Sequence, residues 1–125
     1  MADEAGLCAL VPLLPVRSVP RAIGFYARLG FAVQNTHTPD GGLEPVWAEL
    51  HAGGAQLMLS RSHEASTVTK APVLFYLYTP DVVAFRTELL AKGTQAGAVE
   101  YPFWAPRGEF RVEDLDGYVF MVTHT

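Results

Sequence analysis

The chain has 125 residues, of which half are apolar and 18% are charged, and its formal net charge is -4. This composition excludes intrinsic disorder and fits one domain with a real core. It also argues against nucleic acid as the main partner, because phosphate binding needs clustered lysine and arginine. Cys8 is the only cysteine, which excludes an internal disulfide. We expect a cytoplasmic protein with no membrane partner, since no apolar run spans a bilayer and residues 1–6 lack signal-peptide features.

The first half of the chain carries the pattern of a strand, a helix and three further strands. The predicted elements are a strand at 8–16, a helix at 19–29 and strands at 31–36, 46–51 and 56–61. Ser18 is a typical N-cap for this helix, and Gly30 suits the left-handed position after it. Gly53 and Gly54 predict the turn of a hairpin between the last two strands.

The second half repeats this order after a polar connector. The predicted elements are a strand at 72–78, a helix at 79–92, strands at 94–100, 110–113 and 118–123, and an aromatic loop at 101–108. An offset of 63 residues places Ser18 on Asp81 and Gly30 on Gly93, with no gap between them. A constant offset over half the chain indicates an internal repeat.

This repeat predicts an α+β fold of one domain over residues 1–125. The fold would consist of paired βαβββ modules at about 7–61 and 72–125, joined by a connector at 62–71. Each sheet has one face for its helix, so the other face is free to be buried or used. We therefore expect a curved mixed sheet around a concave cleft, with the helices on its outer face.

Two motifs resemble a known family. Residues 13–31 read LLPVRSVPRAIGFYARLGF, and residues 114–118 read DLDGY. Both are similar to motifs of the vicinal oxygen chelate superfamily, which includes glyoxalase I, extradiol dioxygenases and bleomycin-resistance proteins. The resemblance covers nearly the whole chain and implies the paired βαβββ fold, but one fold hosts many functions.

The resemblance also implies where a metal would bind. Metal-dependent members place one ligand, typically His or Glu, on the first and the last strand of each module. Carried over, these four positions fall on Val11, Met58, Leu74 and Met121. None of them supplies an imidazole or a carboxylate. We therefore expect no metal site and no other cofactor.

Strand alternation predicts which side chains face the cleft. If Leu74 faces it, so do Tyr76 and Tyr78, and the third strand contributes Trp47 and Glu49 with His51 beside them. The expected ligand-binding residues are Trp47, Glu49, Met58, Tyr76, Tyr78, Phe103, Trp104 and Met121. Aromatic rings and methionine suit a planar or cationic small molecule. The loop at 101–108, which contains two of these residues, would pack on its own core, cover the pocket or be buried in a dimer.

The leading hypothesis is a metal-free protein that binds a small molecule in this aromatic cleft. It would resemble bleomycin-resistance proteins, which sequester a drug in grooves shared between the subunits of a homodimer. One alternative is a glyoxalase-like lyase or other superfamily enzyme on a small carbonyl or aromatic substrate, with Glu49 or His51 as the acid–base group. A second alternative is a dimeric interaction module. The sequence leaves open whether the modules pair within one chain or between two.

Overall fold

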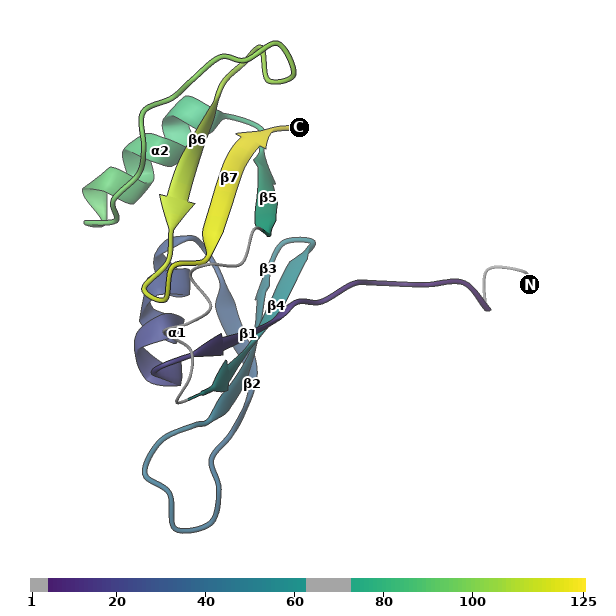
Figure 1. Cartoon of the computed structure of the whole chain (residues 1–125), viewed down its shortest axis with the longest axis vertical. Helices are drawn as coiled ribbons and strands as arrows, with labels where there is room; N and C mark the ends of the chain where they lie inside the picture. Colours follow the sequence, from purple (N-terminus) through teal and green to yellow (C-terminus); the bar gives the residue numbers. More distant parts are fainter. Residues whose placement is uncertain (1–4, 63–72) are drawn as a thin grey trace.

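The computed structural model of the chain describes residues 5–62 and 73–125 (Figure 1). Its elements are β1 (Leu13–Val16), α1 (Val19–Arg28), β2 (Ala32–His37), β3 (Trp47–Ala52), β4 (Ala55–Arg61), β5 (Leu74–Thr79), α2 (Val82–Ala91), β6 (Glu109–Glu113) and β7 (Val119–His124). Most of the predicted connector lies outside the described residues. The two modules of strands and helices confirm the predicted α+β class.

The strands form two mixed sheets. The first sheet has the order β1-β4-β3-β2 and the second has the order β5-β7-β6. In each sheet the first strand pairs in parallel with the last strand of its module, β1 with β4 and β5 with β7. Figure 1 shows the two sheets one beyond the other along the long axis, each with its own helix on the same side. Within the described residues no strand pairing joins the two sheets, so the expected curved sheet is interrupted at the module boundary.

Both predicted helices are present, but α2 begins at Val82 and not at residue 79, because Asp81 is its N-cap. The Ser18 side chain accepts a hydrogen bond from the Arg21 N–H at 3.3 Å, and Asp81 accepts from the Ala84 N–H at 3.0 Å, so both residues are N-caps. Gly30 and Gly93 follow the two helices with φ of 102° and 81°. The repeat offset therefore relates residues with the same structural role.

Two predicted strands differ from the structure. β1 begins at Leu13 instead of at residue 8, and residues 7–10 are an exposed extended arm that points away from the molecule (Figure 1). The prediction of a strand at 94–100 was wrong, because this segment contacts β6 only through an isolated bridge between Glu100 and Glu109 and a hydrogen bond from the Gly97 N–H to the Arg111 carbonyl oxygen. Gly97 and the small residues around it offer little side-chain area to a sheet. The second module therefore has three strands where the repeat predicts four.

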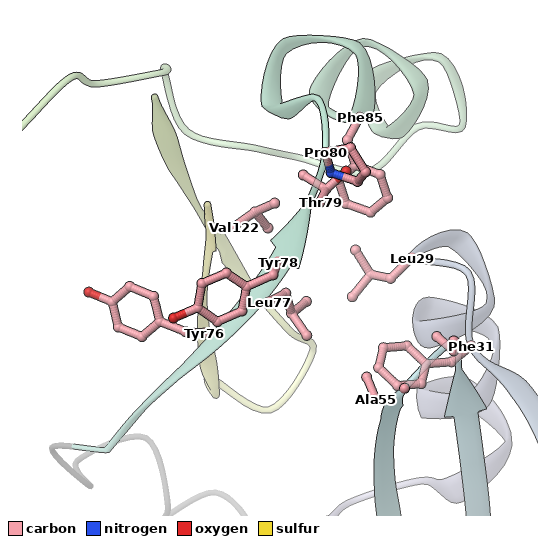
Figure 2. Close-up of a pocket in the computed structure, with 13 residues that line it drawn as sticks. Leu29, Phe31, Ala55, Tyr76, Leu77, Tyr78, Thr79, Pro80, Phe85 and Val122 are labelled. Atoms are coloured by element: carbon pink, nitrogen blue, oxygen red, sulfur yellow. The ribbon is translucent and has the colours of Figure 1, made fainter. Parts of the chain in front are cut away.

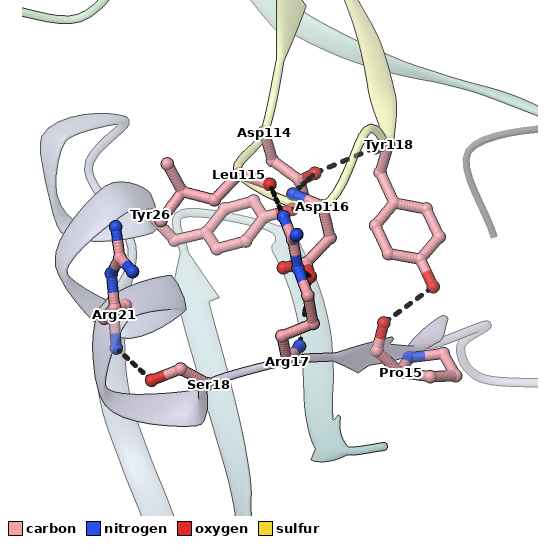
Figure 3. A network of polar contacts seen from close by, with 9 residues as sticks. All are labelled: Pro15, Arg17, Ser18, Arg21, Tyr26, Asp114, Leu115, Asp116 and Tyr118. Carbon is pink, nitrogen blue, oxygen red and sulfur yellow. Dashed lines mark hydrogen bonds and ion pairs between the residues drawn. The ribbon is translucent and has the colours of Figure 1, made fainter. Parts of the chain in front are cut away.

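The residues of the two family-like motifs meet at the junction of the modules (Figure 3). The Tyr26 hydroxyl, from α1, donates a hydrogen bond to Oδ2 of Asp114, which lies in the turn between β6 and β7. The Tyr26 ring also contacts Phe120 edge-on, with the ring centroids 5.7 Å apart. Burial is the largest cause that raises the pKa of both Tyr26 and Asp114. One hydrophobic core consequently contains residues of both modules.

Two further contacts fix the same junction. The backbone N–H and Nε of Arg17 both donate to Oδ1 of Asp116, at 3.0 and 2.9 Å. The Tyr118 hydroxyl donates to the Pro15 carbonyl oxygen at 2.8 Å, and burial raises the pKa of Tyr118 to about 12. Figure 3 shows these contacts side by side, so the turn of the second module is attached to both β1 and α1 of the first. Each sheet has an open face, which is the face that its helix does not cover. The attachment at this junction sets how the two open faces lie relative to each other.

Candidate functional site

The first sheet presents one face that its helix does not cover. In the strand register Glu49 lies opposite Met58, and Trp47 lies opposite Ser60. Side chains on this face are partly exposed, whereas their neighbours in sequence on the other face, such as Leu50, are buried. The predicted alternation on β3 and β4 therefore matches the burial pattern.

Glu49 and His51 form a pair on this open face. The Nε2 atom of His51 lies 2.8 Å from Oε2 of Glu49, and both side chains are 32% exposed. The carboxylate orients the imidazole and leaves its Nδ1 atom as the second polar group of the ring. The pair can attract a cationic group or exchange a proton with a bound molecule.

The second sheet also has an open face, and it is more aromatic. Leu74, Tyr76 and Tyr78 of β5 are 50%, 44% and 66% exposed. Tyr76 lies opposite Met121 in the register, and Phe75 packs on the other face against Phe120, with the ring centroids 5.3 Å apart. Three of the predicted ligand-binding residues, Tyr76, Tyr78 and Met121, thus lie together on this face.

β6 adds charged residues to the second open face, and the sequence prediction missed them. Arg111 lies opposite Met121 in the register, and its Nη2 atom is 3.3 Å from Oε1 of Glu113. Glu109 is only 5% exposed, and its Oε1 accepts a hydrogen bond from Nε1 of Trp104 at 3.2 Å. The strand alternation used for β7 would have found both residues once β6 was placed antiparallel beside it.

The aromatic loop before β6 does not pack on the core. Phe103 is 91% exposed and Trp104 is 59% exposed, and their rings meet edge-on with centroids 5.1 Å apart. Of the loop residues 101–107, Ala105 alone is fully buried. The structure therefore excludes core packing of these two rings.

A groove of about 520 Å³ lies between the two modules (Figure 2). We call it the intermodule groove. Its lining residues are Leu29, Phe31, Ala52, Gly53, Gly54, Ala55, Tyr76, Leu77, Tyr78, Thr79, Pro80, Phe85 and Val122. Of the predicted ligand-binding residues, it includes only Tyr76 and Tyr78. The predicted residues therefore lie on two open faces and a loop, and this groove does not bring them together.

The four positions expected for metal ligands are also spread over separate parts of the structure. Val11 lies in the segment before β1, whereas Met58, Leu74 and Met121 lie on the open faces. Among the residues that the structure describes, no group of three or more His, Cys, Asp or Glu side chains is arranged so that it could hold a metal ion. None of the described helices is long and apolar enough to cross a membrane.

Comparison with known proteins identifies the family. The model of the Glyoxalase/Bleomycin resistance protein/Dioxygenase superfamily matches residues 8–122, and the chain therefore belongs to this superfamily. A search of curated proteins finds no significant match.

Several solved structures share the fold. A bleomycin-binding protein from bleomycin-producing Streptomyces verticillus, in complex with copper(II)-bleomycin, is 19% identical with a TM-score of 0.74, covering 97% of this chain and 98% of that chain. TnmS3, an antibiotic-binding protein from Streptomyces sp. CB03234, is 21% identical with a TM-score of 0.73, covering 96% and 97%. A bleomycin resistance determinant encoded on the transposon Tn5 is 20% identical with a TM-score of 0.74, covering 95% and 98%. At these identities the likeness establishes the fold.

Proposed function

We propose that this protein binds a small organic molecule on its open sheet faces, without a metal, and thereby sequesters it. The observation that carries the proposal is the exposed aromatic row of β5, in which Tyr76 and Tyr78 are 44% and 66% exposed. A soluble protein gains nothing in stability from such a row unless something covers it. The similar structures include proteins that bind bleomycin or another antibiotic, which supports a drug-like ligand.

The composition of the faces supports a planar ligand with a cationic group. Tyrosine rings stack on flat heteroaromatic systems and attract cations over their faces. The carboxylates of Glu49 and Glu109 lie on the two faces, and Arg111 is paired with Glu113. Met58 and Met121 adapt their shape to a ligand of irregular outline.

A homodimer would complete the cleft. In one chain Trp47, Glu49 and Met58 lie on the first open face, whereas Tyr76 and Tyr78 lie on the second. Two-fold symmetry can place the first face of one protomer opposite the second face of its partner, which creates two equal clefts. The exposed Phe103 and Trp104 would then cover the cleft or contact the partner.

The experiment uses the intrinsic fluorescence of the two tryptophans, Trp47 and Trp104. Metal-stripped protein is titrated with planar cationic drugs, including metal-free bleomycin, in the presence of EDTA. We expect saturable quenching at about one ligand per chain. Tyr78→Ala should weaken binding by about two- to twelve-fold, through lost stacking of about 0.5–1.5 kcal/mol, whereas Leu90→Ala, an exposed position on α2, should not. Absence of quenching by every drug, or equal affinities of the two variants, contradicts the proposal.

One observation favours a second candidate function, a glyoxalase-like lyase. The 2.8 Å contact between His51 and Glu49 is a geometry that suits proton transfer to or from a small carbonyl substrate. In that case Glu49→Gln would abolish turnover of such a substrate but leave its binding largely intact. Turnover that is unchanged in Glu49→Gln, or no turnover by the wild type, argues for sequestration. If neither binding nor turnover is found, the remaining function is a dimeric interaction module.

A further inference from the structure

The intermodule groove lies on a different side of β5 from the open face. Figure 2 shows Leu29, Phe31 and Ala55 of the first module on one side of the groove and Leu77 and Phe85 of the second module on the other. The rings of Tyr76 and Tyr78 extend from the opposite side of β5 (Figure 2). We propose that this groove is a second small-molecule site, separate from the open faces, and that it takes a neutral, apolar organic molecule.

The chemistry of the lining selects the ligand class. None of the residues that line the groove is an Asp, Glu, Lys, Arg or His. The rings of Tyr76 and Tyr78 extend to the other side of β5, which leaves the Thr79 hydroxyl as the polar side-chain group on the groove side (Figure 2). An ionised ligand would lose its hydration there without gaining a counter-charge. The volume of about 520 Å³ lies within the range of sites for drug-sized molecules. The groove therefore favours an uncharged molecule over the cationic ligand proposed for the open faces.

The walls of the groove are held in place by the core. Leu29, Phe31 and Val122 are 5%, 6% and 0% exposed, so they are fixed by packing on the side away from the groove. Both walls come from one chain, and the junction through Tyr26 and Asp114 fixes the distance between them. The site therefore needs no second copy of the protein and little ordering when a ligand enters.

Two features keep the groove open and give it polar contacts. Gly54 lies at its rim without a side chain, and a Cβ atom added there would meet nothing within 4 Å. β5 pairs only with β7 in the described part of the chain. Alternate backbone N–H and C=O groups on the outer edge of β5 consequently have no strand partner. They can form a hydrogen bond with one carbonyl or amide group of an otherwise apolar ligand.

The test uses N-phenyl-1-naphthylamine, a neutral apolar probe whose fluorescence rises when it leaves water. We expect saturable binding of one probe per chain. Gly54→Phe places a ring in the groove and should weaken this binding at least ten-fold. Gly24→Phe is the matched control, because Gly24 is exposed on α1 and an added Cβ there also meets nothing within 4 Å. Circular dichroism checks that both variants fold, and Ala55→Leu replaces Gly54→Phe if that variant does not.

Several results would overturn the inference. One is the absence of saturable probe binding, and another is equal affinity in Gly54→Phe and the wild type. A third is a dimer that sediments as a monomer only after Gly54→Phe, because a second copy would then occupy the groove.

The site is also distinguished from the one on the open faces. Neither Trp47 nor Trp104 lines the groove, so Gly54→Phe should leave tryptophan quenching by planar cationic drugs unchanged. Stoichiometric displacement of the probe by such a drug, together with loss of drug quenching in Gly54→Phe, would indicate a single site and contradict a second one. Probe binding without any drug quenching would support the groove and reject the function proposed for the open faces.

Discussion

At the scale of single residues, Asp114 shows how a family-like motif acts in this structure. Its carboxylate accepts hydrogen bonds from the Tyr26 hydroxyl and from the backbone N–H groups of Asp116 and Tyr118. These bonds lower its pKa, but burial at the module junction is the larger effect and raises the pKa above the ordinary value of 3.8. The motif residues therefore join the two modules.

The raised pKa of Asp114 predicts a pH-dependent stability. The folded state holds the proton of this group more tightly than the unfolded state does, so its stabilising contribution is fully present below pH 3.8 and is lost as the pH rises through the folded pKa. We expect the difference in unfolding free energy between the wild type and Asp114→Asn to shrink over that interval. Urea unfolding of both proteins at a series of pH values measures this difference. Subtracting one unfolding free energy from the other cancels the contribution of the carboxylates that both proteins share. A difference that grows with pH would show that the hydrogen bonds dominate and that the pKa is lowered.

At the scale of elements, the sequence predicted the parts that depend on local signals. Caps and periodicity located α1 and α2, and alternation gave the correct faces of β4 and β5. It could not fix the start of β1, because the apolar residues 8–12 have the composition of a strand but no pairing partner along most of their length. It also predicted a strand at 94–100, because the repeat implied one there. The small side chains of this segment do not form that strand.

The end of α1 gives a prediction at this scale. Gly30 has φ of 102° and donates its N–H to the Ala27 carbonyl oxygen at 3.0 Å, so a side chain there would be strained. Gly30→Ala should lower the unfolding free energy by about 1–2 kcal/mol. Gly24→Ala, on the exposed face of the same helix, should raise it by about 0.5–1 kcal/mol. Urea unfolding of both variants checks the opposite signs, and a Gly30→Ala variant as stable as the wild type would disprove the capping role.

At the scale of the whole molecule, the candidate site depends on geometry that no local pattern encodes. Alternation placed Tyr76, Met121, Glu49 and Met58 toward one shared cleft, whereas the structure has the first two on the second sheet and the last two on the first. Whether those faces meet depends on the junction around Asp114 and on the arrangement of two chains. The intermodule groove was not predicted either, because its lining residues come from both modules and share no periodicity.

Mixing two inactive variants tests whether the cleft is shared between chains. One double variant, Glu49→Ala with Met58→Ala, removes ligand-binding side chains from the first face. The other, Tyr76→Ala with Tyr78→Ala, removes them from the second face. In a mixed dimer with shared clefts, one cleft receives both damaged faces and the other receives both intact faces. Half of randomly assembled dimers are mixed and each has one intact cleft of two, so co-refolded variants should regain about a quarter of the wild-type sites. Drug binding by tryptophan quenching measures this, and each variant refolded alone is the control. If each cleft lies within one chain, every chain in the mixture is damaged and no binding returns.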